Sequence, residues 1–399
     1  MLKIRIPRLD GEWFFTAFLI AFWGKDTVLT YFRAVLLRIP YIRSVADYFI
    51  PTLLIACLIP AIPFILRAVS PKDLVFFIGC STIFLFHALL FPDNGEYLLS
   101  LADEFFLILL PLYAIGLRMD ADRDLKTLYI CSMINVCAFC VYILTTSRET
   151  DMQQILYSGF MHRAYTLLPQ LLIVLGYAFK KLNALNLSVS VLGVVLLIAC
   201  GNRGSIVVLS VFVMLGLLFL IGDKLKKAIY TAAFSLGIVC ICFYRRILAL
   251  LNVLIAKLGM SPRLLNYLTE GDFFRSDSRT GISELMLRMI SKRPLVGYGL
   301  TADHVITGSY AHNFAIELWM SFGVIVGSVL LLGVACVVLC AWLHHKNDIL
   351  LTMLLCAGFF KLFISSSFLM EGLFFVMLGY CVSLNRKVSL SSGREGAVV

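Results

Sequence analysis

Tyr310-Ala-His-Asn-Phe-Ala-Ile-Glu-Leu-Trp-Met-Ser-Phe-Gly-Val-Ile-Val-Gly327 opens a long apolar stretch that carries no charge from Leu318 to Leu343. As a helix, such a stretch is long enough to cross roughly 30 Å of hydrocarbon. Its beginning is unusual, because His312 and Asn313 stand at the start and Glu317 follows one turn in. Ionisable groups placed inside a membrane helix indicate function. The stretch therefore predicts a membrane helix whose first turn carries polar chemistry.

The composition of the whole chain agrees with a membrane setting. Of 399 residues, 60% are hydrophobic and 15% charged, and the mean hydropathy is +0.93, outside the balance of soluble proteins. The twelve cysteines lie almost entirely in apolar runs, where cysteine acts as a small hydrophobe. The pair Cys137 and Cys140 lacks companion ligands, so we expect neither a metal nor a cofactor. The net charge of +10 resides mostly in the loops, and nothing indicates nucleic acid.

Apolar runs recur along the chain, separated by short charged or Gly/Pro-marked breaks. We predict an all-α polytopic membrane protein with about twelve membrane-spanning helices, in one integral membrane domain of residues 1–399. The predicted spans lie at residues 12–24, 46–66, 73–91, 102–117, 127–146, 164–179, 184–200, 204–222, 228–244, 312–342, 348–364 and 366–384. The last two can also be interpreted as one broken element.

Lysine and arginine in the short breaks predict the orientation of the spans. If Lys3, Arg5 and Arg8 are cytoplasmic, every later cytoplasmic break is basic. These breaks contain Arg67 and Lys72, then Arg118, Arg123 and Lys126, then Lys180 and Lys181, then Lys224, Lys226 and Lys227, then Lys346, and finally Arg386 and Lys387. The basic loop at 25–45 falls on the outer side, and we interpret it as an interfacial segment. Both termini are then predicted to be cytoplasmic.

The connection of residues 245–311 is long enough to hold structure of its own, and we predict that it is an extracytoplasmic loop between the ninth and tenth spans. It is basic although it lies outside, which long loops tolerate. Residues 247–259 are predicted to lie on the membrane surface. A further helix is predicted after the Ser276-Asp277-Ser278 cluster, because short polar residues suit a helix N-cap. Its apolar positions at helical spacing are Ile282, Leu285, Met286, Met289 and Ile290.

Three arginines from separate stretches are candidates for binding an anion. Arg279 projects with the apolar face of the predicted loop helix, which is costly unless an anion or a carboxylate such as Glu317 meets it. Arg203 lies in a tight turn between glycines, where the common alternative is a solvated anchor. Arg163 stands at the mouth of the sixth span, where the alternative is a snorkelling residue. The predicted topology places all three at outer ends of spans, and guanidinium forks suit a diphosphate.

His312 is a candidate general base at the same outer surface. In the first turn of a helix, the positive end of the peptide dipoles disfavours the imidazolium and keeps the ring neutral near pH 7. A neutral ring there could deprotonate a sugar hydroxyl. The alternative is a histidine that caps a helix at the interface. Asn313 and Glu317 could orient the ring or the acceptor, and Glu317 could instead pair with an arginine.

Four segments follow one another around the long outer loop. They are Gly201-Asn-Arg-Gly-Ser205, Ser278-Arg-Thr-Gly-Ile-Ser-Glu-Leu285, Lys292-Arg-Pro-Leu-Val-Gly-Tyr-Gly299, and Ala311-His-Asn-Phe-Ala-Ile-Glu-Leu318 with Gly323 after it. Their order resembles the O-antigen ligase and O-antigen polymerase superfamily, and the resemblance covers roughly residues 160–340. In that family, Ser or Thr often precedes the turn arginine, where this chain has Asn202.

The resemblance implies a metal-independent glycosyltransferase that takes a glycan from an undecaprenyl diphosphate carrier on the outer face of the bacterial inner membrane. It implies that Arg203 and Arg279 hold the diphosphate and that His312 is the base. The predicted substrate-binding residues are Arg163, Asn313, Glu317, Tyr310 and Arg293. The expected partners are the lipid-linked donor, a glycan or lipid-linked acceptor, membrane lipid and a chain-length regulator.

Two other functions stay open at the level of sequence. The short distance of twelve residues between Gly299 and His312, without an inserted acceptor-binding segment, favours a polymerase over a ligase that transfers glycan to lipid A core. About twelve spans also occur in transporters and flippases, but these usually bind near the midplane and often show two related halves. Here the charged candidates gather at one surface, and the halves look unalike.

Overall fold

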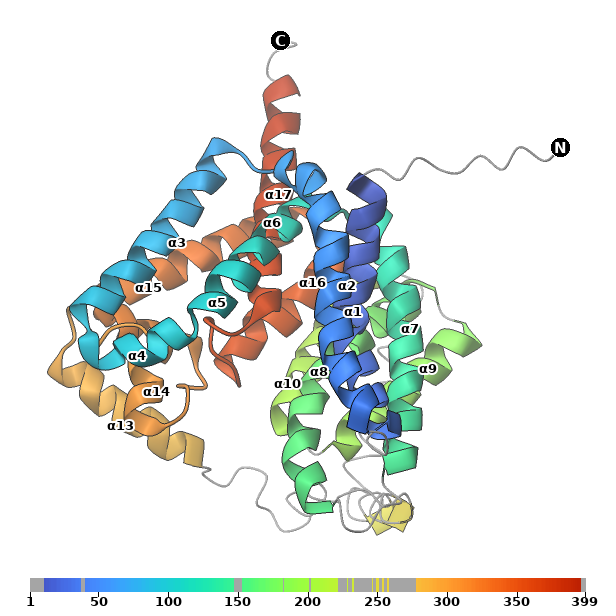
Figure 1. Ribbon diagram of the computed structural model, residues 1–399. Coiled ribbons are helices and arrows are strands. Elements are labelled where there is room, and N and C mark those ends of the chain that lie inside the picture. Colours follow the sequence, from blue (N-terminus) through green and yellow to red (C-terminus); the bar gives the residue numbers. More distant parts are fainter. Residues whose placement is uncertain are drawn as a thin grey trace.

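The computed structural model describes residues 11–36, 40–146, 153–181, 183–200, 202–221 and 278–395, with isolated residues between 228 and 257. For residues 26–51, 144–146, 153–162, 199, 278–280 and 391–395 only the backbone is described. The described chain is all-helical, as predicted. The first turn of α1 and the last turn of α17 lie at one end of the molecule, and α13 and α14 lie at the other (Figure 1).

The first part of the chain forms a succession of helices that follow the predicted apolar runs. They are α1 (Gly11–Leu36), α2 (Pro40–Leu66), α3 (Pro71–Leu90), α4 (Pro92–Ser100), α5 (Ala102–Glu104), the π-helical η1 (Phe105–Leu109), α6 (Leu110–Arg118), α7 (Ala121–Thr146), α8 (Gln153–Lys180), α9 (Ala184–Ala199), α10 (Arg203–Leu215) and the π-helical η3 (Gly216–Leu220).

The second part begins at the predicted loop helix. Its helices are α13 (Ser278–Lys292), α14 (Ala302–Thr307), α15 (Phe314–His344), α16 (Ile349–Leu354), the π-helical η5 (Leu355–Phe359), the 3-10 helix η6 (Phe360–Phe363) and α17 (Gly372–Glu395). The predicted surface segment 247–259 and most of the span predicted at 228–244 lie outside the described residues.

Among the described residues, five helices are long and apolar enough to cross a membrane. They are Pro71–Leu90, Ala121–Ile143, Arg203–Leu220, Phe314–His344 and Gly372–Leu390. A sixth is added if α4 and the helix Ala102–Arg118, bent by 55° from each other, count as one span. The outer face of α3 exposes Val75, Ile78 and Leu89, a surface that lipid can cover. These features are compatible with a polytopic membrane protein.

The basic segment 25–45 differs from its prediction as a loop. α1 continues to Leu36 and α2 begins at Pro40, so the break between the two helices is reduced to residues 37–39. α1 and α2 then lie side by side as a helical hairpin (Figure 1). Lysine and arginine are good helix formers, so a basic stretch does not by itself end a helix.

The described breaks that were predicted to be cytoplasmic meet at the end of the molecule where α1 begins, and those at residues 3–8 and 224–227 lie outside the described residues. There Arg386 Nη2 donates to Asp73 Oδ1 over 2.6 Å, which joins α17 to the start of α3. Lys387 Nζ donates to Asp120 Oδ2 over 2.7 Å, which joins α17 to the break between α6 and α7. The surface hollow that contains Lys387 is also bordered by Lys180, His344 and Lys346.

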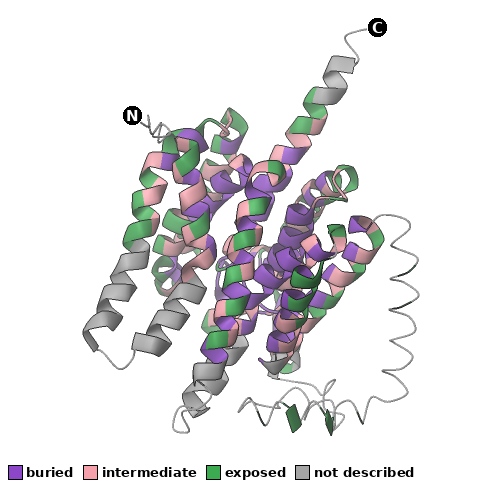
Figure 2. Ribbon diagram, turned by 90° about the vertical axis from the view of Figure 1, so that its right-hand side faces the viewer, coloured by how far each residue is buried: buried purple, intermediate pink, exposed green. Residues whose placement is uncertain are grey.

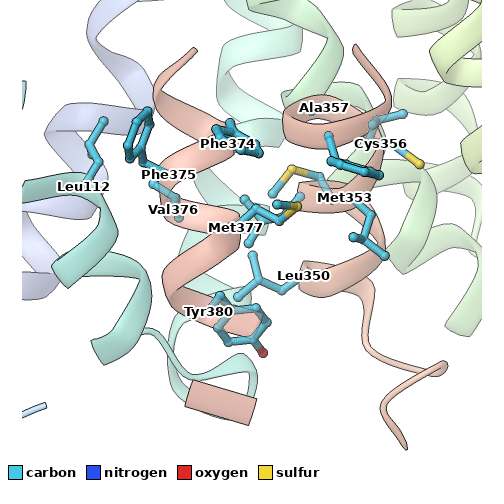
Figure 3. Packing of buried hydrophobic residues seen from close by; sticks show 14 of the residues in the cluster. Leu112, Leu350, Met353, Cys356, Ala357, Phe374, Phe375, Val376, Met377 and Tyr380 are labelled. Carbon is cyan, nitrogen blue, oxygen red and sulfur yellow. The ribbon is translucent and has the colours of Figure 1, made fainter. Parts of the chain in front are cut away.

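The core lies where α16, η5 and α17 pack together. Figure 3 shows Met377 and Tyr380 of α17 beside Met353 and Leu350 of α16, and all four are buried. Figure 2 shows buried residues concentrated along these central helices and exposed ones on the outer helices. The C-terminal helix therefore forms part of the core and is not an appendage.

α15 is interrupted at Gly323, where φ is 77° and ψ is 168°. Glycine alone adopts this conformation readily. The segment Pro294 to Gly299 fits into the interruption, because Tyr298 N–H donates to Met320 O over 2.7 Å and Val324 N–H donates to Pro294 O over 2.6 Å. Gly323 is thus a break in the helix that receives a backbone segment.

Candidate functional site

His312 lies just before α15 and not in its first turn as predicted. Asn313 is the N-cap, and its Oδ1 accepts the N–H groups of Ala315 and Ile316 over 3.0 and 3.3 Å. His312 has φ of 54°, in the left-handed region that few non-glycine residues adopt. Such residues cluster at functional sites, where the surroundings hold them in place. His312 remains beside the positive end of the α15 dipole.

The segment that leads to His312 is held by contacts on both sides. The ring of Tyr310 lies 4.2 Å from the ring of His312, centroid to centroid. Asp303 of α14 accepts the N–H of Ala311 over 2.9 Å. Asp303 is buried, and this burial raises the pKa of its carboxyl. The backbone before His312 is therefore fixed by a buried side chain.

Glu317 is buried in the first turns of α15. The hydroxyl of Ser367 donates to it, and the N–H of Phe368 donates to its Oε2 over 3.3 Å. The sequence predicted that Glu317 orients the ring of His312 or the acceptor, or pairs with an arginine. Its described partners are instead a hydroxyl and a backbone amide. Glu317 joins the connection between η6 and α17 to the helix that follows His312.

The turn before α10 presents Arg203 as the first residue of that helix. Asn202 is the buried N-cap, and its Oδ1 accepts the N–H of Ser205 over 3.1 Å. Asn, Ser and Thr are all preferred N-caps, so Asn202 satisfies a backbone N–H group at the start of α10. Gly204 packs so closely on Tyr165 of α8 that a Cβ would collide with the tyrosine hydroxyl.

Arg163 lies beside the same turn. It precedes Tyr165 on α8, and its guanidinium carbon is 4.6 Å from the ring centroid of Tyr142 of α7. The positive charge of Arg163 interacts electrostatically with Cys200. Cys200 lies at the end of α9, directly before the turn that carries Arg203. The elements that carry Arg163 and Arg203 are therefore neighbours, as the predicted topology requires.

A cavity of about 520 Å³ is lined by Tyr310, whose ring contacts that of His312, and by Tyr165, which packs on Gly204. His312, Arg163 and Arg203 themselves are not among its lining residues. Further walls come from α1, from η1 and α6, and from the connection between η6 and α17. Its volume lies within the range of about 300 to 1,000 Å³ that is usual for ligand sites.

An ion pair between Lys361 and Glu371 forms part of this wall. Ser366 Oγ donates to Glu371 Oε2 over 3.1 Å, and Lys361 Nζ lies 4.9 Å from the ring centroid of Tyr165. Glu371 precedes α17, which begins at Gly372 and not at residue 366, where the last predicted span begins. The ion pair therefore joins η6 to the end of the non-helical connection that leads to α17.

No described contact joins two of the predicted site residues, Arg293 and Arg279, to the residues around the cavity. Arg293 is exposed near the end of α13, with its guanidinium carbon 5.1 Å from the ring centroid of Tyr298. Arg279 lies in the first turn of α13, and its side chain is outside the described residues. The apolar face predicted for this helix is confirmed at Met286 and Ile290, which are buried.

The described chain offers no metal centre, because none of its groups of His, Cys, Asp and Glu side chains has three members placed to hold an ion. Cations, carboxylates and hydroxyls line the cavity, and the ring of His312 contacts Tyr310 in its wall. Comparisons of the chain with protein-family models, with curated proteins and with solved structures find no match.

Proposed function

We propose that the protein is a membrane glycosyltransferase that polymerises undecaprenyl-diphosphate-linked oligosaccharide units into O-antigen or capsular-type polysaccharide. The observation that carries this proposal is the cavity of about 520 Å³. Its lining includes Tyr310, whose ring contacts that of His312, and Tyr165, which packs on Gly204 beside Arg203. A base and guanidinium groups on elements next to one cavity suit transfer from a lipid diphosphate.

The proposed setting is the bacterial inner membrane, with about twelve crossings and both termini cytoplasmic. The basic end, with Arg386 and Lys387, then faces the cytoplasm. The end with His312 and Arg203 faces the periplasm or the cell exterior, where a chain-length regulator would meet the protein. Membrane lipid would cover the apolar outer helices.

In the proposed reaction, His312 takes the proton of an acceptor hydroxyl, and that oxygen attacks the anomeric carbon of the donor sugar. The bond between this carbon and the diphosphate oxygen breaks, and the diphosphate leaves with the electron pair. Arg203 and Arg279 stabilise the negative charge that grows on the leaving group. Stabilisation that is stronger in the transition state than in the ground state accelerates the reaction.

Lysine should not replace either of these arginines. Arg203→Lys and Arg279→Lys keep the charge but lose the planar fork that binds two phosphate oxygens at once. We expect each variant to lower polymer formation by roughly tenfold or more, given the strength of bidentate charge-assisted bonds. The assay would incubate purified protein with carrier-linked repeat units and measure chain length on a gel. Arg288→Lys, at an exposed position of α13, is the matched control and should keep wild-type activity.

The rival functions differ in what accumulates when the protein is absent. A strain without the polymerase should accumulate single carrier-linked units. A strain without a ligase would accumulate long carrier-linked chains, and loss of a flippase would leave units on the cytoplasmic side. Long chains or inward-facing units would contradict the proposed polymerase.

A further inference from the structure

We propose that the cavity of about 520 Å³ is the binding site for the saccharide part of a substrate, and that Lys361 and Glu371 bind its hydroxyl groups. This inference rests on the proposed function and deepens it. It separates the site into two parts, the arginine-bearing turn for the diphosphate and the cavity for the sugar.

The charges of the cavity wall suit an uncharged ligand. Lys25 and Lys361 are balanced by Glu104 and Glu371, and none of the described lining residues is an arginine. A diphosphate needs an excess of positive charge, preferably from guanidinium forks. The described cavity wall provides no such excess, whereas Arg163 and Arg203 lie on neighbouring elements.

The polar groups of the wall suit hydroxyls, which both donate and accept. The Lys361 ammonium can only donate, and the ionised Glu371 carboxylate can only accept. A sugar hydroxyl beside the pair can accept from the first and donate to the second. Ser365 and Ser366 add hydroxyls to the same wall, whereas the hydroxyl of Ser367 donates to Glu317 and accepts the N–H of Leu369. Aromatic residues such as Trp23 also line the cavity, so that its wall combines apolar surface with directed polar groups.

The stability of the fold does not account for the ion pair. The Lys361 side chain is 15% exposed and that of Glu371 is 9% exposed, so both charges are largely removed from water. Replacing such a pair by apolar residues is often neutral or even stabilising. Ionisable residues in this environment usually serve a function. Binding a ligand that bonds to both charges would be such a function.

The double variant Lys361→Met with Glu371→Leu tests this inference in purified protein in lipid nanodiscs. We expect its thermal unfolding midpoint to equal or exceed that of the wild type. We expect the KM for carrier-linked repeat units to rise at least about tenfold, the loss of about 1.4 kcal/mol of binding. The Kd for undecaprenyl diphosphate, which carries no sugar, should stay within about twofold. Lys387→Met, in the exposed pair at the other end, is the control and should change neither constant.

Three other results of this experiment would each overturn a different part of the proposal. An unchanged KM in the double variant overturns the role of the pair while the proposed function stands. Loss of undecaprenyl diphosphate binding along with activity would assign the cavity to the diphosphate and overturn the division of the site. A wild-type protein that neither binds undecaprenyl diphosphate nor joins repeat units overturns the proposed function itself. If the double variant unfolds, the single variant Glu371→Gln, which keeps the shape, must show the rise in KM.

Discussion

His312→Ala is expected to abolish polymer formation while undecaprenyl diphosphate still binds. Removing a general base typically lowers a rate by about 100-fold to 10,000-fold. The arginines proposed to hold the diphosphate come from other elements, so the binding of the carrier should be nearly unchanged. The measurement is chain formation from carrier-linked repeat units, with carrier binding measured on the same preparation. Full polymer formation by His312→Ala would refute the role of the base.

A second substitution separates the chemistry of His312 from its backbone. Asparagine tolerates the left-handed region that His312 occupies at φ 54°, but its amide cannot act as a base. We therefore expect His312→Asn to fold normally and to be as inactive as His312→Ala. The control is His344→Ala, at the exposed far end of α15, the helix that His312 precedes. This variant should keep full activity. An active His312→Asn would mean that the position matters only for its backbone.

Gly323→Ala is expected to destabilise the protein by about 3 kcal/mol or more, because two costs add at this position. A residue with a side chain at φ 77° and ψ 168° is strained by roughly 1 to 3 kcal/mol. In addition, the new Cβ would collide with the carbonyl of Leu295, which belongs to the segment seated in the interruption of α15. We expect the variant to express poorly or to unfold at a much lower temperature.

The control for this substitution lies in the same helix. Gly333 has no atom within 4 Å of the position that a Cβ would take, and it lies in the regular part of α15. Gly333→Ala should raise the stability by up to about 1 kcal/mol through helix propensity. Thermal unfolding in detergent measures both variants. Equal stability of Gly323→Ala and the wild type would contradict the described break in α15.

The apolar runs predicted the described helices well because lipid leaves the backbone few choices. A long uncharged run must satisfy its own backbone groups, so its position in the sequence nearly fixes a helix. The prediction of helices from apolar runs failed in segments whose structure does not depend on apolar residues. The basic segment 25–45 was taken for a loop, although charged residues form helices readily. The interruption at Gly323 depends on a distant segment at 294–299, and no local pattern announces it.

The candidate site was predictable in its parts but not in its assembly. His312, Arg203 and Arg163 stand out because the predicted topology places their titratable or charged groups together at the outer ends of spans, where short loops carry few basic residues. The roles of Asp303 and Tyr165 were missed, since Asp303 acts through the backbone of Ala311 and Tyr165 through contact with Gly204. Such contacts come from tertiary packing, which a single sequence does not encode in any short motif.

Reconstitution of the purified wild-type protein in liposomes with carrier-linked repeat units tests the central claim most directly. The units would be extracted from a strain that lacks the protein, and the products would be separated by chain length. If the protein joins lipid-linked glycans as proposed, a ladder of longer carrier-linked chains appears and undecaprenyl diphosphate is released in step with it. Units that remain single, whether left in place or moved across the bilayer, would contradict the account.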